Sequence, residues 1–161
     1  MLSPVSSAVA PPPLLSCVTP ASAALPPRRR RLARWVTEAV AAEVPGVRAS
    51  MRRSLEEWGV PSGCVEDLLL IGTELLSNAV RHAGGAAGRP CVTVTRDGGL
   101  LQLDVADGDR RLPCVGLDAG AEAEGGRGLL IVRVLVSRAG GELSAFPVAS
   151  GKVVRVRIPA T

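Results

Sequence analysis

The chain has 161 residues, about the length of one domain, which argues against two packed domains. Its net charge of +4 would by itself suggest a nucleic-acid partner. However, the excess sits in Arg28, Arg29, Arg30 and Arg31, and the rest of the chain holds 15 basic and 15 acidic residues. With two Trp, one Phe and no Tyr, the sequence also offers few rings for base stacking, so a nucleic-acid surface is poorly supported.

Residues 1–30 are rich in Pro, Ala and Ser and are predicted to be a disordered leader that ends in the arginine run. Residues 31–161 form the predicted folded domain. No apolar run approaches the ~20 residues that span a bilayer, and nothing basic precedes the weak apolar stretch near the N-terminus, as a secretory signal requires. A cytoplasmic location is therefore expected.

The first folded segment, 31–43, fits either a helix or an edge strand around 35–37, and its spacing does not decide between them. Pro45-Gly46 is expected to end this segment. Apolar residues then recur at steps of four, four and three over 47–58, which predicts an amphipathic helix. A longer helix is predicted from an N-cap at Ser62 to about residue 83, where two glycines follow.

Beyond the long helix the apolar period changes to two. Residues 91–95 and 101–106 predict a β-hairpin around an Asp-Gly-Gly turn. The stretch 107–126 shows no regular pattern, and a loop this long in a compact domain is typical of a lid. A third helix is expected over 128–138, and a last pair of strands at about 142–146 and 153–158. This order predicts an α/β two-layer sandwich, with a mixed, largely antiparallel sheet covered on one face by helices.

The long helix carries a polar face that includes Glu74, Asn78, Arg81 and His82. A carboxylate one turn from a carboxamide is chemically useful, because the amide oxygen is a hard ligand for Mg²⁺ and the carboxylate can orient or deprotonate a hydroxyl. Taken alone, this face is also what a solvated helix surface looks like.

Two further segments have residues suited to a nucleotide. Asp107-Gly108 follows a strand, where the carboxylate can accept a hydrogen bond from an adenine amino group while the glycine lets the ring approach; Asp-Gly is also a common turn. Glycines at 125, 126 and 128 open the third helix, where backbone N–H groups can converge on phosphate. Arg127 would add a charge-assisted contact. A flexible hinge explains these glycines equally well.

In combination, three segments resemble the GHKL ATP-binding domain shared by gyrase, histidine kinases and MutL: E-L-L-S-N-A-V-R-H-A, V-A-D-G and G-G-R-G-L. The similarity is closest to the bacterial anti-sigma-factor serine kinases and covers about 47–159. The resemblance implies the Bergerat-type α/β fold, with ATP and Mg²⁺ as cofactors.

The resemblance also implies roles for single positions. Glu74 would be the catalytic carboxylate, Asn78 would coordinate Mg²⁺, and Asp107 would hold the adenine amino group. Gly126 and Gly128 would line the phosphate-binding lid, and Gly151 would belong to a closing turn near the nucleotide. The positions implied for nucleotide binding are Asn78, Asp107, Gly108, Gly126, Arg127, Gly128, Leu129 and Gly151.

The activity implied is transfer of the ATP γ-phosphate to a serine of an anti-anti-sigma antagonist, often by a homodimer that otherwise holds a sigma factor. The alternative is a non-catalytic nucleotide-binding module that sequesters a protein partner. A departure from the family pattern motivates this alternative. The usual adenine motif is D-x-G-x-G, whereas the two expected glycine positions here hold Asp109 and Arg111.

Overall fold

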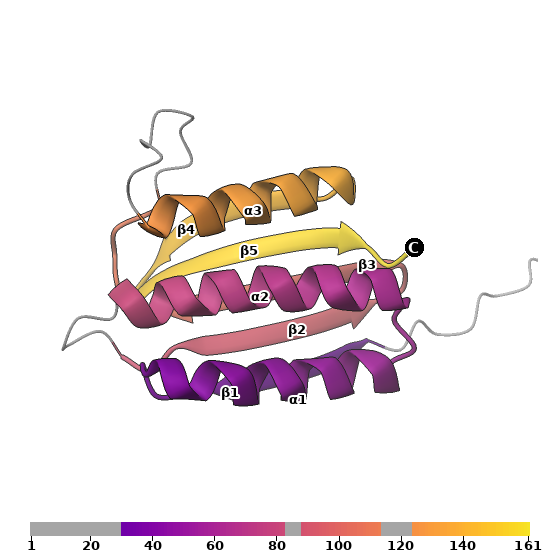
Figure 1. The fold of residues 1–161 in the computed structure, drawn as a ribbon, viewed down its shortest axis with the longest axis horizontal. Helices are drawn as coiled ribbons and strands as arrows, with labels where there is room; N and C mark the ends of the chain where they lie inside the picture. The colour runs from indigo at the N-terminus through magenta and orange to yellow at the C-terminus, as the bar shows by residue number, and fades with distance from the viewer. Residues whose placement is uncertain (1–29, 83–87, 114–123) are drawn as a thin grey trace, which may run out of the picture.

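The structure, a computed structural model, describes residues 30–82, 88–113 and 124–161, without the side chains of 124–126. Three helices lie side by side over one face of a sheet (Figure 1). In chain order the elements are β1 (Arg31–Val36), η1 (Ala41–Glu43), α1 (Val44–Glu57), α2 (Ser62–His82), β2 (Cys91–Asp97), β3 (Leu100–Asp107), α3 (Glu124–Arg138), β4 (Glu142–Val148) and β5 (Gly151–Pro159). The predicted two-layer α/β sandwich is confirmed. None of the described helices is both long and apolar enough to cross a membrane.

The sheet has five strands in the order β1-β2-β3-β5-β4, and each pairing of these described strands is antiparallel. Strand β5 lies between β3 and β4. Helix α3, which connects β3 to β4 in the chain, therefore crosses over the helix-covered face and packs beside α2. This crossover brings the start of α3 next to the end of α2.

The core lies between the sheet and the helices and follows the two periods of the sequence. Along β3 and β5 every second residue is buried under the helices. These inward residues are Leu101, Leu103 and Val105 on β3, and Val154, Val156 and Ile158 on β5. The same two inward rows continue to Asp107 and Lys152, so a carboxylate and an ammonium end the apolar core at one edge.

The structure decides one open alternative and corrects two expected boundaries. Of the two conformations that fit the first segment, the edge strand is present, as β1, at Arg31–Val36 instead of around 35–37. Pro45 and Gly46 do not end that segment, because they lie in the first turn of α1, where the missing N–H of proline costs nothing. Helix α3 begins at Glu124, so the last residues of the predicted lid are helical. Half of that lid, 114–123, and the predicted leader up to residue 29 lie outside the described residues.

Candidate functional site

The polar residues of α2 meet the start of α3. Glu74 and Asn78 are both half-buried and lie one turn apart on α2. A Cβ at Gly128 would overlap Oε2 of Glu74 and would lie 3.8 Å from Nδ2 of Asn78. A side chain at this position would have to push the Glu74 carboxylate aside, so Glu74, Asn78 and Gly128 form one group, here called the helix cluster.

The remaining predicted residues of this region differ in exposure. Arg127 is exposed in the first turn of α3, and Gly126 lies in the same turn. The first turn of a helix has backbone N–H groups without intrahelical partners, which suits an anion. Leu129 packs against the apolar core instead. On α2, Arg81 is exposed and its Nη1 donates a hydrogen bond to Oδ1 of Asn78 at 3.3 Å, while His82 is exposed.

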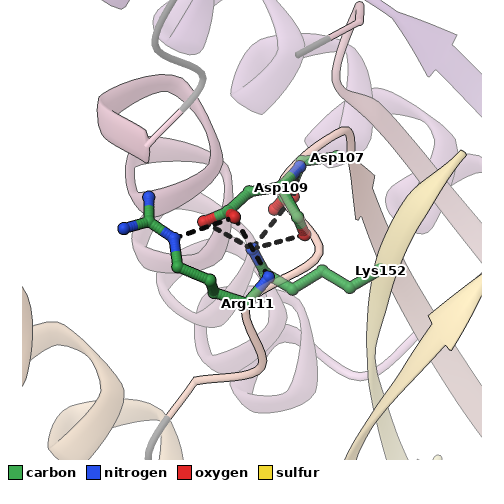
Figure 2. A network of polar contacts seen from close by, with 4 residues as sticks. All are labelled: Asp107, Asp109, Arg111 and Lys152. Carbon is green, nitrogen blue, oxygen red and sulfur yellow. Dashed lines mark hydrogen bonds and ion pairs between the residues drawn. The ribbon is translucent and has the colours of Figure 1, made fainter.

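A second group of charged residues lies where β3 ends and β5 begins (Figure 2). Asp107 and Lys152 are directly opposite each other in the ladder. Lys152 Nζ donates to Oδ1 of Asp107 at 3.0 Å and to the carbonyl oxygen of Asp109 at 3.2 Å, and it lies 3.5 Å from Oδ2 of Asp109. The side chains of Asp107 and Lys152 are only 5% and 8% exposed, so this ion pair is buried.

Two successive turns after β3 are stabilised by hydrogen bonds from backbone N–H groups to aspartate side chains. The backbone N–H of Asp109 donates to Oδ1 of Asp107 at 2.9 Å, and the backbone N–H of Arg111 donates to Oδ1 of Asp109 at 3.0 Å. The pKa of Asp109 falls to about 2, chiefly because of that backbone hydrogen bond, then because of the Arg111 guanidinium and the charge of Lys152. Asp107, Asp109, Arg111 and Lys152 are called the sheet cluster.

Gly151 fixes the distance between the two strand ends. Its φ is +146°, in a region that other residues rarely adopt. A Cβ there would overlap the carbonyl oxygen of Asp107 and the Cα of Gly108. The backbone of β5 therefore passes so close to Asp107-Gly108 that no side chain fits between them.

The two clusters occupy the same end of the molecule. The end of α2, the start of α3, the end of β3 and the start of β5 all lie there (Figure 1). The predicted residues are thus gathered in two groups, around Glu74 and around Asp107. Lys152 was missing from the predicted site, although one signal was available, since it is the only lysine in the sequence and follows the predicted glycine turn.

The chemistry of the helix cluster fits a magnesium–phosphate group. Asn78 and Glu74 supply the amide and carboxylate oxygens that Mg²⁺ prefers. Gly128 lets the Glu74 carboxylate and the Asn78 amide lie directly against the start of α3, and the first turn of that helix has N–H groups without intrahelical partners. The residues present therefore suit a bound nucleotide with its metal.

Residues 37–158 match the family model of the histidine kinase-like ATPase domain. The chain belongs to this family. The matched region contains both clusters of the candidate site. No curated protein gave a significant match.

Solved structures share the fold of this histidine kinase-like ATPase domain. The RsbU and RsbW domains of Rv1364c from Mycobacterium tuberculosis match with a TM-score of 0.56 and 20% identity, over 80% of this chain and 32% of that one. A histidine kinase domain from Erythrobacter litoralis matches with a TM-score of 0.51 and 22% identity, over 74% and 60% of the two chains. The catalytic domain of histidine kinase ThkA matches with a TM-score of 0.54 and 14% identity, over 81% and 97%. This chain thus spans less than two thirds of the first two proteins.

Proposed function

We propose that this chain is an ATP-binding regulatory protein of the anti-sigma-factor kinase type, which transfers phosphate from ATP to a serine of an anti-anti-sigma antagonist. The observation that supports this most is the helix cluster. It brings a carboxylate, a carboxamide and the glycine-rich start of a helix together in one place. A phosphoryl-transfer site needs positioned charge more than covalent chemistry, and these groups supply it.

Each residue of the helix cluster has a part in this proposal. Asn78 would hold Mg²⁺ through its amide oxygen, and Glu74 would accept the hydrogen bond of the incoming serine hydroxyl and orient it. The N–H groups at the start of α3, with Arg127, would bind phosphate oxygens. Bound Mg²⁺ would supply neutralisation of phosphate charge.

The sheet cluster would receive the base. Asp107 would accept a hydrogen bond from the adenine amino group. Gly108 would let the ring approach the backbone beside Asp107, and Gly151 would keep the start of β5 close to that position. The proposed partners are the antagonist and a sigma factor, with a homodimer as the working assembly and the cytoplasm as the location.

The decisive experiment is the substitution Asn78→Ala, followed by calorimetric titration with ATP in the presence of Mg²⁺. We expect magnesium-dependent ATP binding to be lost, because alanine removes the ligand oxygen. Asp67→Asn, three turns earlier on α2, removes a charge away from both clusters and serves as the control that binds normally. Unchanged binding by the Asn78 variant would reject the assignment.

A non-catalytic nucleotide-binding module is the second candidate, and the sheet cluster favours it. Lys152 already engages the carboxylate that would hold the base, and Asp109 and Arg111 replace the glycines of the family motif. A radiolabel transfer assay from ATP to a candidate antagonist separates the two functions. Binding without transfer to any antagonist tested favours the module, and a labelled serine establishes the kinase.

A further inference from the structure

Lys152 and Asp107 present a donor and an acceptor side by side. Among the described residues, the ammonium of Lys152 makes two hydrogen bonds, to Oδ1 of Asp107 and to the carbonyl of Asp109. An ammonium has three N–H groups, and beyond these two bonds the nearest described acceptor is Oδ2 of Asp109 at 3.5 Å, longer than an ordinary hydrogen bond, so the third N–H can serve a closer acceptor. The carboxylate of Asp107 receives both of its described hydrogen bonds on Oδ1, which leaves Oδ2 for a further donor.

The position of this pair makes the two unused groups significant. Both side chains point to the helix-covered face of the sheet, in line with the buried rows of β3 and β5. Burying an ammonium is costly unless its charge is paired, and Asp107 and Asp109 pair it here. The pair is therefore a fixed feature of the place where the proposed function puts the base.

Purines are told apart at C6. Adenine has an amino group there, which donates, whereas guanine and hypoxanthine have a carbonyl oxygen, which accepts. A carboxylate alone accepts from the amino group and repels the carbonyl oxygen. A carboxylate with an ammonium 3.0 Å away can form a hydrogen bond with either group. Oδ2 of Asp107 would accept from the amino group, and Nζ of Lys152 would donate to the carbonyl oxygen.

We infer that Lys152 is a specificity-determining residue that makes this base site accept 6-oxo purine nucleotides as well as 6-amino ones. The site takes GTP and ITP in addition to ATP. The inference rests on the proposed function, since it requires the nucleotide base to lie at Asp107. It concerns the choice of base and is independent of whether phosphate is transferred.

The first test uses the wild-type chain and measures the Kd of four nucleotides with Mg²⁺: ATP, GTP, ITP and purine riboside triphosphate, which has no group on C6. We expect GTP and ITP to bind within about tenfold of ATP, and the unsubstituted purine to bind about tenfold more weakly than ATP, because it forms neither hydrogen bond.

The second test is Lys152→Met, which keeps the length of the side chain and removes the donor. GTP and ITP affinity should fall by about tenfold or more, while ATP affinity stays within about threefold. Arg155→Met is the matched control, because Arg155 pairs with Asp104 on the same two strands but on the other face of the sheet. It should leave the ratio of ATP to GTP affinity unchanged.

The variants are checked for folding by circular dichroism. If Lys152→Met is unfolded, Lys152→Gln replaces it, because the amide keeps a neutral donor and should retain part of the GTP binding. A wild-type chain that binds ATP more than about a hundredfold tighter than GTP and ITP overturns the inference and leaves the proposed ATP binding intact. An equal loss of ATP and GTP affinity in Lys152→Met also overturns it. A wild-type chain that binds no purine nucleotide overturns both.

Discussion

Two ion pairs join β3 to β5, and they differ in how many of their hydrogen-bonding groups remain without a partner among the described residues. Arg155 donates from Nε and Nη2 to the two carboxylate oxygens of Asp104, both at 2.8 Å, and its guanidinium lies 5.0 Å from the ring centre of Phe146. The hydrogen bonds that Arg155 donates to Asp104 raise the pKa of Arg155. This pair faces away from the helices and its side chains are 29% and 19% exposed.

The pair of Lys152 with Asp107 lies on the opposite face, three residues along each strand, and is buried. The bidentate Arg155 pair uses both oxygens of its carboxylate, so it is complete as a strand-to-strand link. The Lys152 pair uses one oxygen of its carboxylate and two of three N–H groups within the described residues. We therefore expect a ligand to bind at the pair whose hydrogen-bonding groups are not all used, that of Lys152 and Asp107, and not at the pair of Arg155 and Asp104.

The largest expected effect comes from the backbone that holds the buried pair together. Gly151→Ala should lower the free energy of unfolding by about 4 kcal/mol, because the new methyl group overlaps backbone atoms that cannot move independently of the sheet. Urea denaturation measures it. Gly140→Ala is the control, with φ +65° and nothing within 4 Å of the added methyl group, and should cost about 1 kcal/mol. Equal losses of stability in the two variants would contradict the close approach of the β5 backbone to Asp107-Gly108.

The next prediction compares how much stability is lost when the cation of each ion pair is removed. Lys152→Met should cost about 3 kcal/mol of stability, because it leaves a buried carboxylate without its cation. Arg155→Met should cost about 1 kcal/mol, since Asp104 is then hydrated at the surface. Chemical denaturation of both variants measures the difference.

A double variant shows whether the unpaired charge is the cause. Asp107→Asn combined with Lys152→Met leaves no buried charge and should be more stable than Lys152→Met alone. If the double variant is less stable than the single one, the loss arises from packing of the lysine side chain and the electrostatic explanation is wrong.

The contrast between these pairs shows what sequence patterns can and cannot predict. The long helix and its polar residues Glu74 and Asn78 follow from a local period of 3.6, and the alternation of β3 follows from a period of two. The pairing of Asp107 with Lys152 joins residues 45 positions apart. It depends on the register of β3 with β5, which no local pattern encodes.

Two other features of the structure could not be predicted from local sequence patterns, because they too depend on tertiary contacts. Strand β1 is exposed along much of its length, so it has no clear alternation, and its pairing with β2 decides its conformation. Glycines at 125 and 126 weaken helical propensity, yet α3 includes them. Tertiary packing of α3 against α2 stabilises this helix beyond what its own sequence predicts.

Gly128 tests the helix cluster with little effect on stability. In Gly128→Ala the methyl group meets the far end of the Glu74 side chain, which can turn aside, so the free energy of unfolding should change by about 1 kcal/mol or less. ATP affinity should fall by about tenfold or more, because the methyl group displaces Glu74 from the proposed phosphate site. Calorimetric titration and a thermal melt measure the two effects, and Gly63→Ala, in open space at the start of α2, is the control. Full ATP affinity in Gly128→Ala would place the nucleotide elsewhere.

The smallest effect is the acid sensitivity of the sheet cluster. The pKa of Asp109 is about 2 in the folded protein, against a usual value of 3.8, so its ionised form stabilises the fold above about pH 4. This contribution is lost as the pH falls from about 4 to about 2. The stability difference between wild type and Asp109→Asn should therefore be largest above pH 4 and should fall towards zero between pH 4 and pH 2. Urea denaturation at several pH values would show this.

Arg111→Ala keeps the backbone N–H that is the main cause of the shift in the pKa of Asp109 and removes only the guanidinium. Its stability should therefore differ less from that of wild type over the same pH interval. A difference that is constant from pH 6 to pH 2 would mean that the charge of Asp109 does not contribute, and that its turn is held by geometry alone.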